Sequence, residues 1–76
     1  MSAETELRAW ITDRDRRPEL PLDEHTALFT DRRLTSLDLP ELIMLVERLG
    51  RRTITVDEIS AANFASMATI TAGFLR

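Results

Sequence analysis

The chain has 76 residues, 43% of them apolar and 30% charged, and its formal net charge is −3. A chain of this length forms one domain, over residues 1–76, with little interior volume for an active site. The acidic balance argues against a nucleic-acid-binding protein, because phosphates attract basic surfaces. No apolar run approaches the ~20 residues that cross a membrane, and the N-terminal stretch lacks the apolar segment of a signal peptide. We therefore expect a cytoplasmic protein that binds neither nucleic acid nor membrane.

Several residue types that carry chemistry are missing. The chain contains no cysteine, and all ten basic residues are arginine, which stays protonated and transfers no protons. The missing cysteine excludes disulfides, thiolate nucleophiles and cysteine metal sites. The one histidine, His25, is interpreted as a surface or packing residue, and the acids lack the spacing of a calcium loop. We expect no catalytic residue, no metal site and no enzymatic activity, and we interpret the arginine doublets at 16–17, 32–33 and 51–52 as solvated surface.

A first helix is predicted over residues 4–16. Its stripe repeats at i, i+3, i+4 and i+7 and consists of Leu7, Trp10, Ile11 and the stem of Arg14. Ser2 with Thr5, or Glu4 in the first turn, caps its start, and Pro18 stops it. We expect Trp10 to lie in the core with its neighbours on the stripe.

A long connection follows over residues 17–35, in which the apolar residues show no sustained helical or strand period. Pro18 and Pro21 make its first part extended, and Asp23 is placed to cap one short helical turn. A connection of this length is unusual in a small domain and often has a function. Five apolar residues are expected to anchor it to the core: Leu20, Leu22, Leu28, Phe29 and Leu34.

The second helix is predicted over residues 36–49, and Gly50 is expected to end it as the first residue outside the helix. At 100° per residue, one face of this helix is apolar. That core stripe consists of Leu39, Leu42, Ile43, Val46 and Leu49.

The opposite side of this helix also carries large apolar residues. Leu37 and Met44 are two turns apart, Glu41 lies between them, and Asp38 and Glu47 lie toward the flanks. An exposed apolar pair rimmed by acids is typical of a protein docking surface, and methionine suits a surface that meets several partners. The alternative is a scatter of ordinary surface hydrophobic residues. We call these five residues the docking face.

Two further helical segments complete the chain. Residues 57–62 predict a brief helix, and Ser66 is placed to cap a last helix over residues 66–76. In that last helix Met67, Ile70 and Phe74 follow the 3.6-residue period. The predicted fold class is therefore all-α: a small four-helix bundle of three longer helices and one short helix, with a long first loop.

Pro40 constrains the start of the second helix. Its ring clashes with the carbonyl four residues back, which belongs to Ser36, so Ser36 must lie at or before the helix N-cap. Ser36 is therefore predicted at the junction of loop and helix, close to backbone N–H groups that lack helical partners. Taken alone, a serine or threonine at this place, Ser36 or Thr35, is most simply interpreted as an N-cap.

The residues around Ser36 resemble those of acyl carrier proteins. The run LTSLDLPEL, residues 34–42, resembles the family signature of an acid followed by S-L-D-x-x-E-L. Leu28-Phe29 resembles the L-F pair that precedes the modified serine. The run NFASM, residues 63–67, resembles the segment that opens the last helix in carrier domains of specialised metabolism. Together these features extend the resemblance over residues 5–75.

The resemblance implies that Ser36 carries 4′-phosphopantetheine, transferred from coenzyme A by a separate phosphopantetheinyl transferase. The prosthetic thiol then holds a cargo as a thioester, so a chain without cysteine obtains its thiol from the cofactor. The resemblance also implies that the second helix docks partners, which assigns this role to Leu37, Asp38, Glu41, Met44 and Glu47. The partners expected are the transferase, a cargo-loading ligase or acyltransferase, and downstream biosynthetic enzymes.

The chain departs from the family pattern at three positions. Thr35 stands where the family usually has an aspartate, Pro40 is unusual, and Arg48 replaces a frequent acid. These differences favour a free-standing carrier of natural-product biosynthesis, such as a polyketide pathway. Thr35 favours loading by a transferase of broad specificity, and we expect the protein to be a monomer. The alternatives are an aminoacyl or peptidyl carrier, and a helical adaptor that is never modified and binds partners through the docking face.

Overall fold

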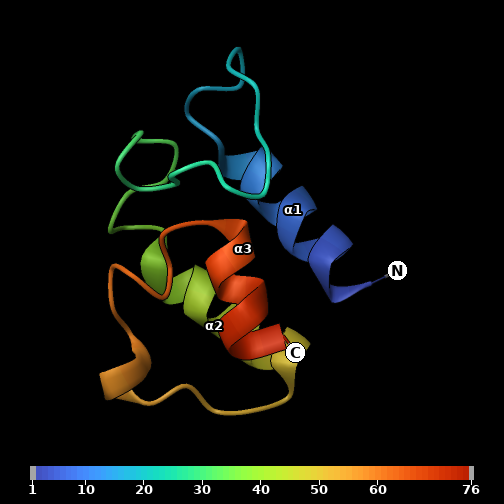
Figure 1. Ribbon diagram of the computed structural model, residues 1–76, viewed down its shortest axis with the longest axis vertical. Helices are drawn as coiled ribbons and strands as arrows, with labels where there is room; N and C mark the ends of the chain where they lie inside the picture. The colour runs from blue at the N-terminus through green and yellow to red at the C-terminus, as the bar shows by residue number, and fades with distance from the viewer. Residues whose placement is uncertain (1, 76) are drawn as a thin grey trace.

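Three α-helices form where the sequence shows its clearest helical periods, within residues 2–75, the part of the chain that the computed structural model describes (Figure 1). Helix α1 spans Ala3–Arg14, α2 spans Leu39–Gly50 and α3 spans Met67–Ile70. A 3-10 turn at Val56–Glu58 follows α2, and a π-helical turn at Thr71–Leu75 continues α3. No strand occurs among these residues, so the prediction of an all-α fold is confirmed for them.

Helix α1 is capped as its sequence predicts. The Ser2 hydroxyl oxygen accepts a hydrogen bond from the Thr5 backbone N–H at 3.1 Å. Leu7 and Ile11 are fully buried, whereas Trp10 is only partly buried and packs against the edge of the core. The helix ends at Arg14, two residues earlier than predicted, because Asp15 takes an extended conformation.

Helices α1 and α2 run antiparallel, and ion pairs mark both ends of their contact. Arg14, at the end of α1, pairs with Glu41 near the start of α2. Arg48, near the end of α2, pairs with Glu6 near the start of α1 at 2.6 Å. The antiparallel arrangement of α1 and α2 therefore brings the end of α1 next to the segment that contains Ser36.

The connection between α1 and α2 is long, as predicted, and backbone hydrogen bonds fix it to the rest of the fold. The Leu28 N–H donates to the Ala65 carbonyl at 2.9 Å, and the Ala68 N–H donates to the Glu24 carbonyl at 2.8 Å. Both bonds join the connection to the start of α3. Asp23 does not begin a helix; its carboxylate accepts the His25 N–H at 2.8 Å and forms a local turn.

Arg33 corrects the interpretation of the arginine doublets as solvated surface. Its side chain is only 3% exposed and pairs with the Asp15 carboxylate, which is 4% exposed, at 2.9 Å. It also donates to the Pro21 carbonyl. A buried charge requires such partners, and this pair joins the end of α1 to the loop three residues before Ser36.

Helix α2 begins and ends differently from the prediction. Asp38 is the N-cap, and Pro40 lies in the first turn, where its missing N–H costs no helical hydrogen bond. At the other end Gly50 is still helical, and Arg51 adopts the left-handed conformation with φ 55°. The prediction that Gly50 is the first residue outside the helix is therefore wrong.

Gly50 has a steric role instead. A Cβ atom built on Gly50 lies 2.5 Å from the Phe74 carbonyl oxygen, a backbone atom of the π-helical turn. Only glycine lets these two backbones approach so closely. In Figure 1 the chain end coloured red accordingly lies beside the C-terminal end of α2.

Replacing Gly50 with alanine is expected to destabilise the protein by about 1–3 kcal/mol, because the new methyl group pushes two backbones apart. Gly73→Ala is the matched control, since its Cβ meets nothing within 4 Å. That control is expected to be neutral or slightly stabilising, because alanine favours helical structure over glycine. Urea unfolding of both variants tests the pair, and equal stability changes would contradict the steric role of Gly50.

The core contains residues from all three α-helices and from the loops. Phe64 and Phe74 stack with their ring centroids 5.2 Å apart. From α3 and the following turn, Met67, Ile70 and Phe74 are buried as predicted. In α2 the buried residues are Leu42, Leu45 and Val46, so the buried stripe includes Leu45, which the prediction omits.

The brief helix predicted over residues 57–62 is a single 3-10 turn at Val56–Glu58. The predicted helix is shortened because polar side chains form hydrogen bonds with the nearby backbone, in place of the hydrogen bonds of a continuous helix. The Glu58 carboxylate accepts the Thr55 N–H at 3.1 Å, and the Ser60 hydroxyl accepts the Asn63 N–H at 3.1 Å.

Candidate functional site

Ser36 lies in a turn that leads directly into α2. The Asp38 N–H donates to the Thr35 carbonyl at 2.9 Å, and the Leu39 N–H donates to the Ser36 carbonyl at 3.3 Å. The side chain of Ser36 is exposed. This placement agrees with the constraint from Pro40, which requires Ser36 to lie at or before the N-cap.

Thr35 and Asp38 supply the side-chain contacts that close this turn. The Asp38 carboxylate accepts the Thr35 N–H at 2.9 Å, and the Thr35 hydroxyl accepts the Leu37 N–H at 3.3 Å. Asp38 is the residue before α2, but its side chain makes no cap hydrogen bond to the helix, so the capping contacts come from Thr35, one of the two predicted caps, and not from Ser36. The fold therefore leaves the Ser36 hydroxyl outside the contacts that start α2.

Asp38 is held in its ionised form by its surroundings. Its side chain is 13% exposed, and Arg16 donates to the carboxylate at 2.5 Å. Burial acts to raise the pKa of Asp38, but hydrogen bonds from the Thr35 N–H and from Arg16 outweigh it and lower the pKa below 3.8, its ordinary value.

A lowered pKa makes stability depend on pH in a defined direction. The ionised Asp38 stabilises the fold above pH 3.8, and this contribution is lost as the pH falls through the lower pKa of the folded state. We expect Asp38→Asn to be less stable than the wild type at pH 7 and the two to converge below pH 3.8. Thermal unfolding from pH 7 to pH 2 measures this, with Asp57→Asn, an exposed acid, as the control. A difference in stability between Asp38→Asn and the wild type that stays constant from pH 7 to pH 2 would contradict the role of the Asp38 charge.

The other two acids of the docking face are also engaged within the chain. Glu41, with 59% of its side chain exposed, pairs with Arg14. Glu47 accepts the Ile54 N–H at 2.8 Å and so helps to hold the loop that follows α2. The acids predicted to rim the docking face therefore already have partners in the folded chain.

The apolar residues of the docking face point away from the core. Leu37 is 84% exposed and Met44 is 68% exposed, which are values typical of surface side chains. The helical period of the predicted second helix placed Leu37 and Met44 on the side opposite the core stripe, and both are exposed in the structure. Their role in docking stays a prediction.

Replacing Met44 with glutamate is expected to change the free energy of unfolding by no more than about 0.5 kcal/mol, because the side chain is exposed. For a carrier of the kind that the sequence resembles, transfer of cargo from a loading enzyme is expected to fall about tenfold or more, since a charge buried against an apolar partner is costly. Val56→Glu is the control, because Val56 is also exposed but lies outside the docking face. Unchanged transfer by Met44→Glu would remove Met44 from the docking face.

A hollow of about 570 Å³ opens beside Ser36. Its apolar walls include Phe29, Leu34, Leu39, Ile59 and Phe64. Its polar lining includes Ser36, Thr35, Ser60 and Arg32. The walls come from the first loop, the start of α2 and the segment before α3, so the fold assembles an apolar surface next to the exposed hydroxyl.

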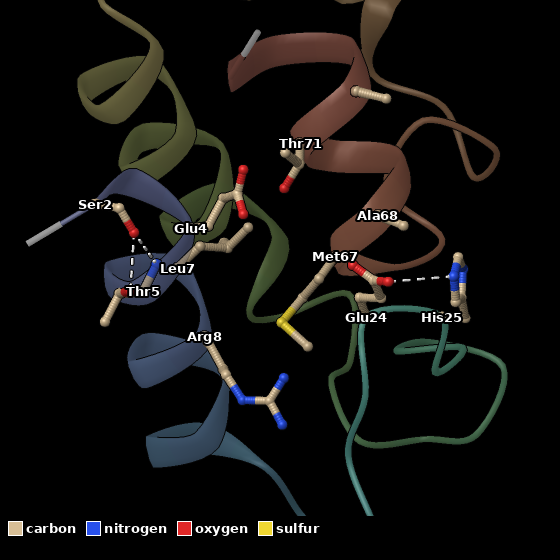
Figure 2. Close-up of a pocket in the computed structure, with 11 residues that line it drawn as sticks. Ser2, Glu4, Thr5, Leu7, Arg8, Glu24, His25, Met67, Ala68 and Thr71 are labelled. Atoms are coloured by element: carbon tan, nitrogen blue, oxygen red, sulfur yellow. Dashed lines mark hydrogen bonds and ion pairs between the residues drawn. The ribbon is translucent and has the colours of Figure 1, made fainter.

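A second hollow, of about 520 Å³, lies between α1, the first loop and α3 (Figure 2). Charges of both signs line it, including Glu4, Arg8 and Glu24, and His25 lies 3.5 Å from the Glu24 carboxylate at its edge. Both members of that pair are mostly exposed. None of the predicted site residues lines this hollow, so the candidate site is the one beside Ser36.

Neither a protein-family model, nor a curated protein, nor a solved structure matches this chain. Among the helices of residues 2–75, none is long and apolar enough to cross a membrane. The same residues contain no group of three or more histidine and acidic side chains placed to hold a metal ion.

The sequence does not reveal several residues of this site. Arg14 and Arg16 reach the acids of α2 across the antiparallel contact, and Arg32 lines the hollow. The alternating charges of residues 14–16 were a visible signal. Assigning their partners, however, requires knowing how α1 lies against α2.

Proposed function

We propose that this protein is an acyl carrier protein that tethers a biosynthetic intermediate as a thioester on 4′-phosphopantetheine attached to Ser36. The observation that carries the proposal is an exposed serine hydroxyl, outside the capping contacts, at the entrance of an exposed helix face. Leu37 follows it directly, and an apolar hollow lies beside it. These features are what a modified serine needs, since the transferase must reach the hydroxyl and the cargo needs an apolar surface.

The residues around Ser36 are compatible with a phosphodiester. Helix α2 begins three residues later, and the partial positive charge of a helix N-terminus favours a nearby anion. Arg32 lines the same hollow and adds a cation. When bound, 4′-phosphopantetheine supplies the thiol on which cargo is carried, while the chain positions the attachment point and shields the cargo from water.

The finer fold assignment belongs to the same proposal. We interpret the arrangement as an acyl-carrier-like four-helix bundle in which the 3-10 turn Val56–Glu58 takes the place of the short helix. The partners proposed are a phosphopantetheinyl transferase, a cargo-loading ligase or acyltransferase and downstream biosynthetic enzymes. The chain itself presents cargo and catalyses no step.

The mostly apolar walls of the hollow favour an acyl cargo over an aminoacyl cargo, because a charged amine is costly to bury without a partner. An unmodified adaptor remains the second candidate, since exposed Leu37 and Met44 serve it equally well. The two classes differ in one respect, namely whether Ser36 becomes covalently modified.

Intact mass spectrometry after incubation with coenzyme A and a broad-specificity phosphopantetheinyl transferase tests the proposal. We expect the mass to rise by one 4′-phosphopantetheine group. A chain that keeps its original mass under conditions that fully load a known carrier would favour the adaptor. Peptide mapping then assigns the modified residue.

A further inference from the structure

One cation lines the hollow beside Ser36. Among the described residues that form its walls, Arg32 alone carries a charge, and the other side chains are apolar or end in a hydroxyl group. Arg32 and Ser36 are four residues apart in the sequence, and both are exposed. The hollow therefore brings a positive charge and an exposed hydroxyl to the same, otherwise uncharged surface.

The guanidinium of Arg32 has no carboxylate partner within residues 2–75, whereas Arg16 and Arg33 each bind one. Asp31, its neighbour in the chain, is exposed, forms no ion pair with Arg32 and does not line the hollow. An anion at the mouth of the hollow can therefore reach Arg32 without displacing a carboxylate of this chain.

A tight turn fixes the backbone from which Arg32 extends. The Arg33 N–H donates to the Leu28 carbonyl at 2.9 Å, and the Arg32 N–H donates to the Phe29 carbonyl at 3.0 Å. This is the Schellman arrangement that ends a helical turn, and it places Arg32 in the left-handed conformation with φ 60°. Leu34, two residues later, is only 1% exposed. The turn thus holds the Cα–Cβ bond of Arg32 in one direction, and the side-chain rotamers remain free.

We propose that Arg32 binds the phosphodiester of the 4′-phosphopantetheine attached to Ser36. This inference rests on the proposed carrier function and adds a cofactor-binding residue to the same site. The phosphorus atom is bonded to the Ser36 oxygen, so the two unesterified oxygens, which share one negative charge, lie beside the hollow that Ser36 lines. A guanidinium presents paired N–H donors that match two phosphate oxygens.

The acid that follows Ser36 most closely does not cancel this attraction. The Asp38 carboxylate is 13% exposed, and Arg16 and the Thr35 N–H already bind it. An arginine–phosphate contact at the surface is a modest interaction that salt weakens. Its main effect is therefore to orient the prosthetic arm, because a held phosphate fixes the first bonds of the arm along the apolar walls of the hollow.

Phosphorus-31 NMR of the holo protein tests the contact directly. We expect the resonance of Arg32→Gln to move from the wild-type position toward that of the urea-unfolded holo protein, because the phosphate loses its cation. Arg51→Gln is the matched control, since Arg51 is also exposed and left-handed, at φ 55°, but lies outside the hollow. Its resonance should coincide with that of the wild type. Arg32→Lys keeps the charge without the paired donors and is the second variant if Arg32→Gln is poorly folded.

The change in Tm on loading is a second measurement. Loading should raise the Tm of the wild type by about 2–4 °C more than that of Arg32→Gln, and this excess should fall by at least half in about 0.5 M NaCl. Asp31→Asn should show the same rise as the wild type, because Asp31 forms no ion pair with Arg32 in the structure. A larger rise in Asp31→Asn would mean that Asp31 already occupies Arg32, against the inference.

The outcomes separate this inference from the proposed function. If holo Arg32→Gln and the holo wild type share one phosphorus resonance and one change in Tm, Arg32 does not bind the phosphodiester and the carrier function stands. The same holds if Arg51→Gln shifts both as far as Arg32→Gln does, since net charge alone then explains the effect. If no transferase modifies Ser36 under conditions that load a known carrier, the carrier function fails and this inference fails with it.

Discussion

Replacing Ser36 with alanine is expected to abolish the gain of 4′-phosphopantetheine completely while the domain stays folded. The modified oxygen is removed, so no loading remains at this position. Stability should change by no more than about 0.5 kcal/mol, because Ser36 is exposed and Thr35 and Asp38 make the contacts of the turn. Intact mass after incubation with coenzyme A and transferase measures the loading, and thermal unfolding measures the stability.

The matched control for this experiment is Ser60→Ala. Ser60 is an exposed serine that lines the same hollow from its other side. Its alanine variant should be loaded as the wild type is. Phosphopantetheine on Ser36→Ala, or its loss from Ser60→Ala alone, would move the attachment point away from Ser36.

Replacing Asp15 with asparagine is expected to cost about 3–5 kcal/mol, the loss typical when one partner of a buried ion pair is removed. Arg33 is 3% exposed and would keep its charge in the interior without a counter-charge. A domain of this length has a total stability of roughly 4–11 kcal/mol, so Asp15→Asn should remove a large share of it. Urea unfolding at pH 7 measures the change.

Two further variants distinguish the buried pair from charge effects in general. Asp13→Asn makes the same change of net charge at a carboxylate that is 83% exposed and should stay within about 0.5 kcal/mol of the wild type. Asp15→Leu/Arg33→Met removes both charges and should recover most of the loss, because Arg33 Nε already lacks a hydrogen-bond partner among the described residues. Equal losses in Asp13→Asn and Asp15→Asn would contradict the importance of the pair.

The locations of α1 and α2 follow from the sequence because both have an apolar stripe along most of their length. The same periodicity is enough to place Leu37 and Met44 on the exposed side, and the chemistry of proline is enough to place Ser36 before the helix. These predictions depend only on local geometry. They succeed because nothing far away in the chain overrides them.

The remaining features depend on contacts between distant segments. A side chain does not fit at Gly50 because the Phe74 carbonyl lies against it, and Leu45 is buried although it lies outside the predicted core stripe of α2. Arg33 resembles any surface arginine until Asp15 is brought beside it. The ion pairs of Asp38 and Glu41 arise in the same way, from the antiparallel contact of α1 with α2.

Two of the walls of the hollow beside Ser36 differ in their backbone hydrogen bonding. The start of α2 belongs to a regular helix, whereas residues 59–65 lie outside the three α-helices, with a backbone bond from the Phe64 N–H to the Ser60 carbonyl at 3.2 Å. Segments with few backbone hydrogen bonds open locally at a lower free energy than helices, and amide exchange should be faster there. The hollow can therefore widen by yielding at one wall, while α2 keeps Ser36 in a fixed position. If the proposed carrier function is correct, the size of the hollow is then set by the group that occupies it, and we expect cargoes of different lengths to be carried from the same attachment point.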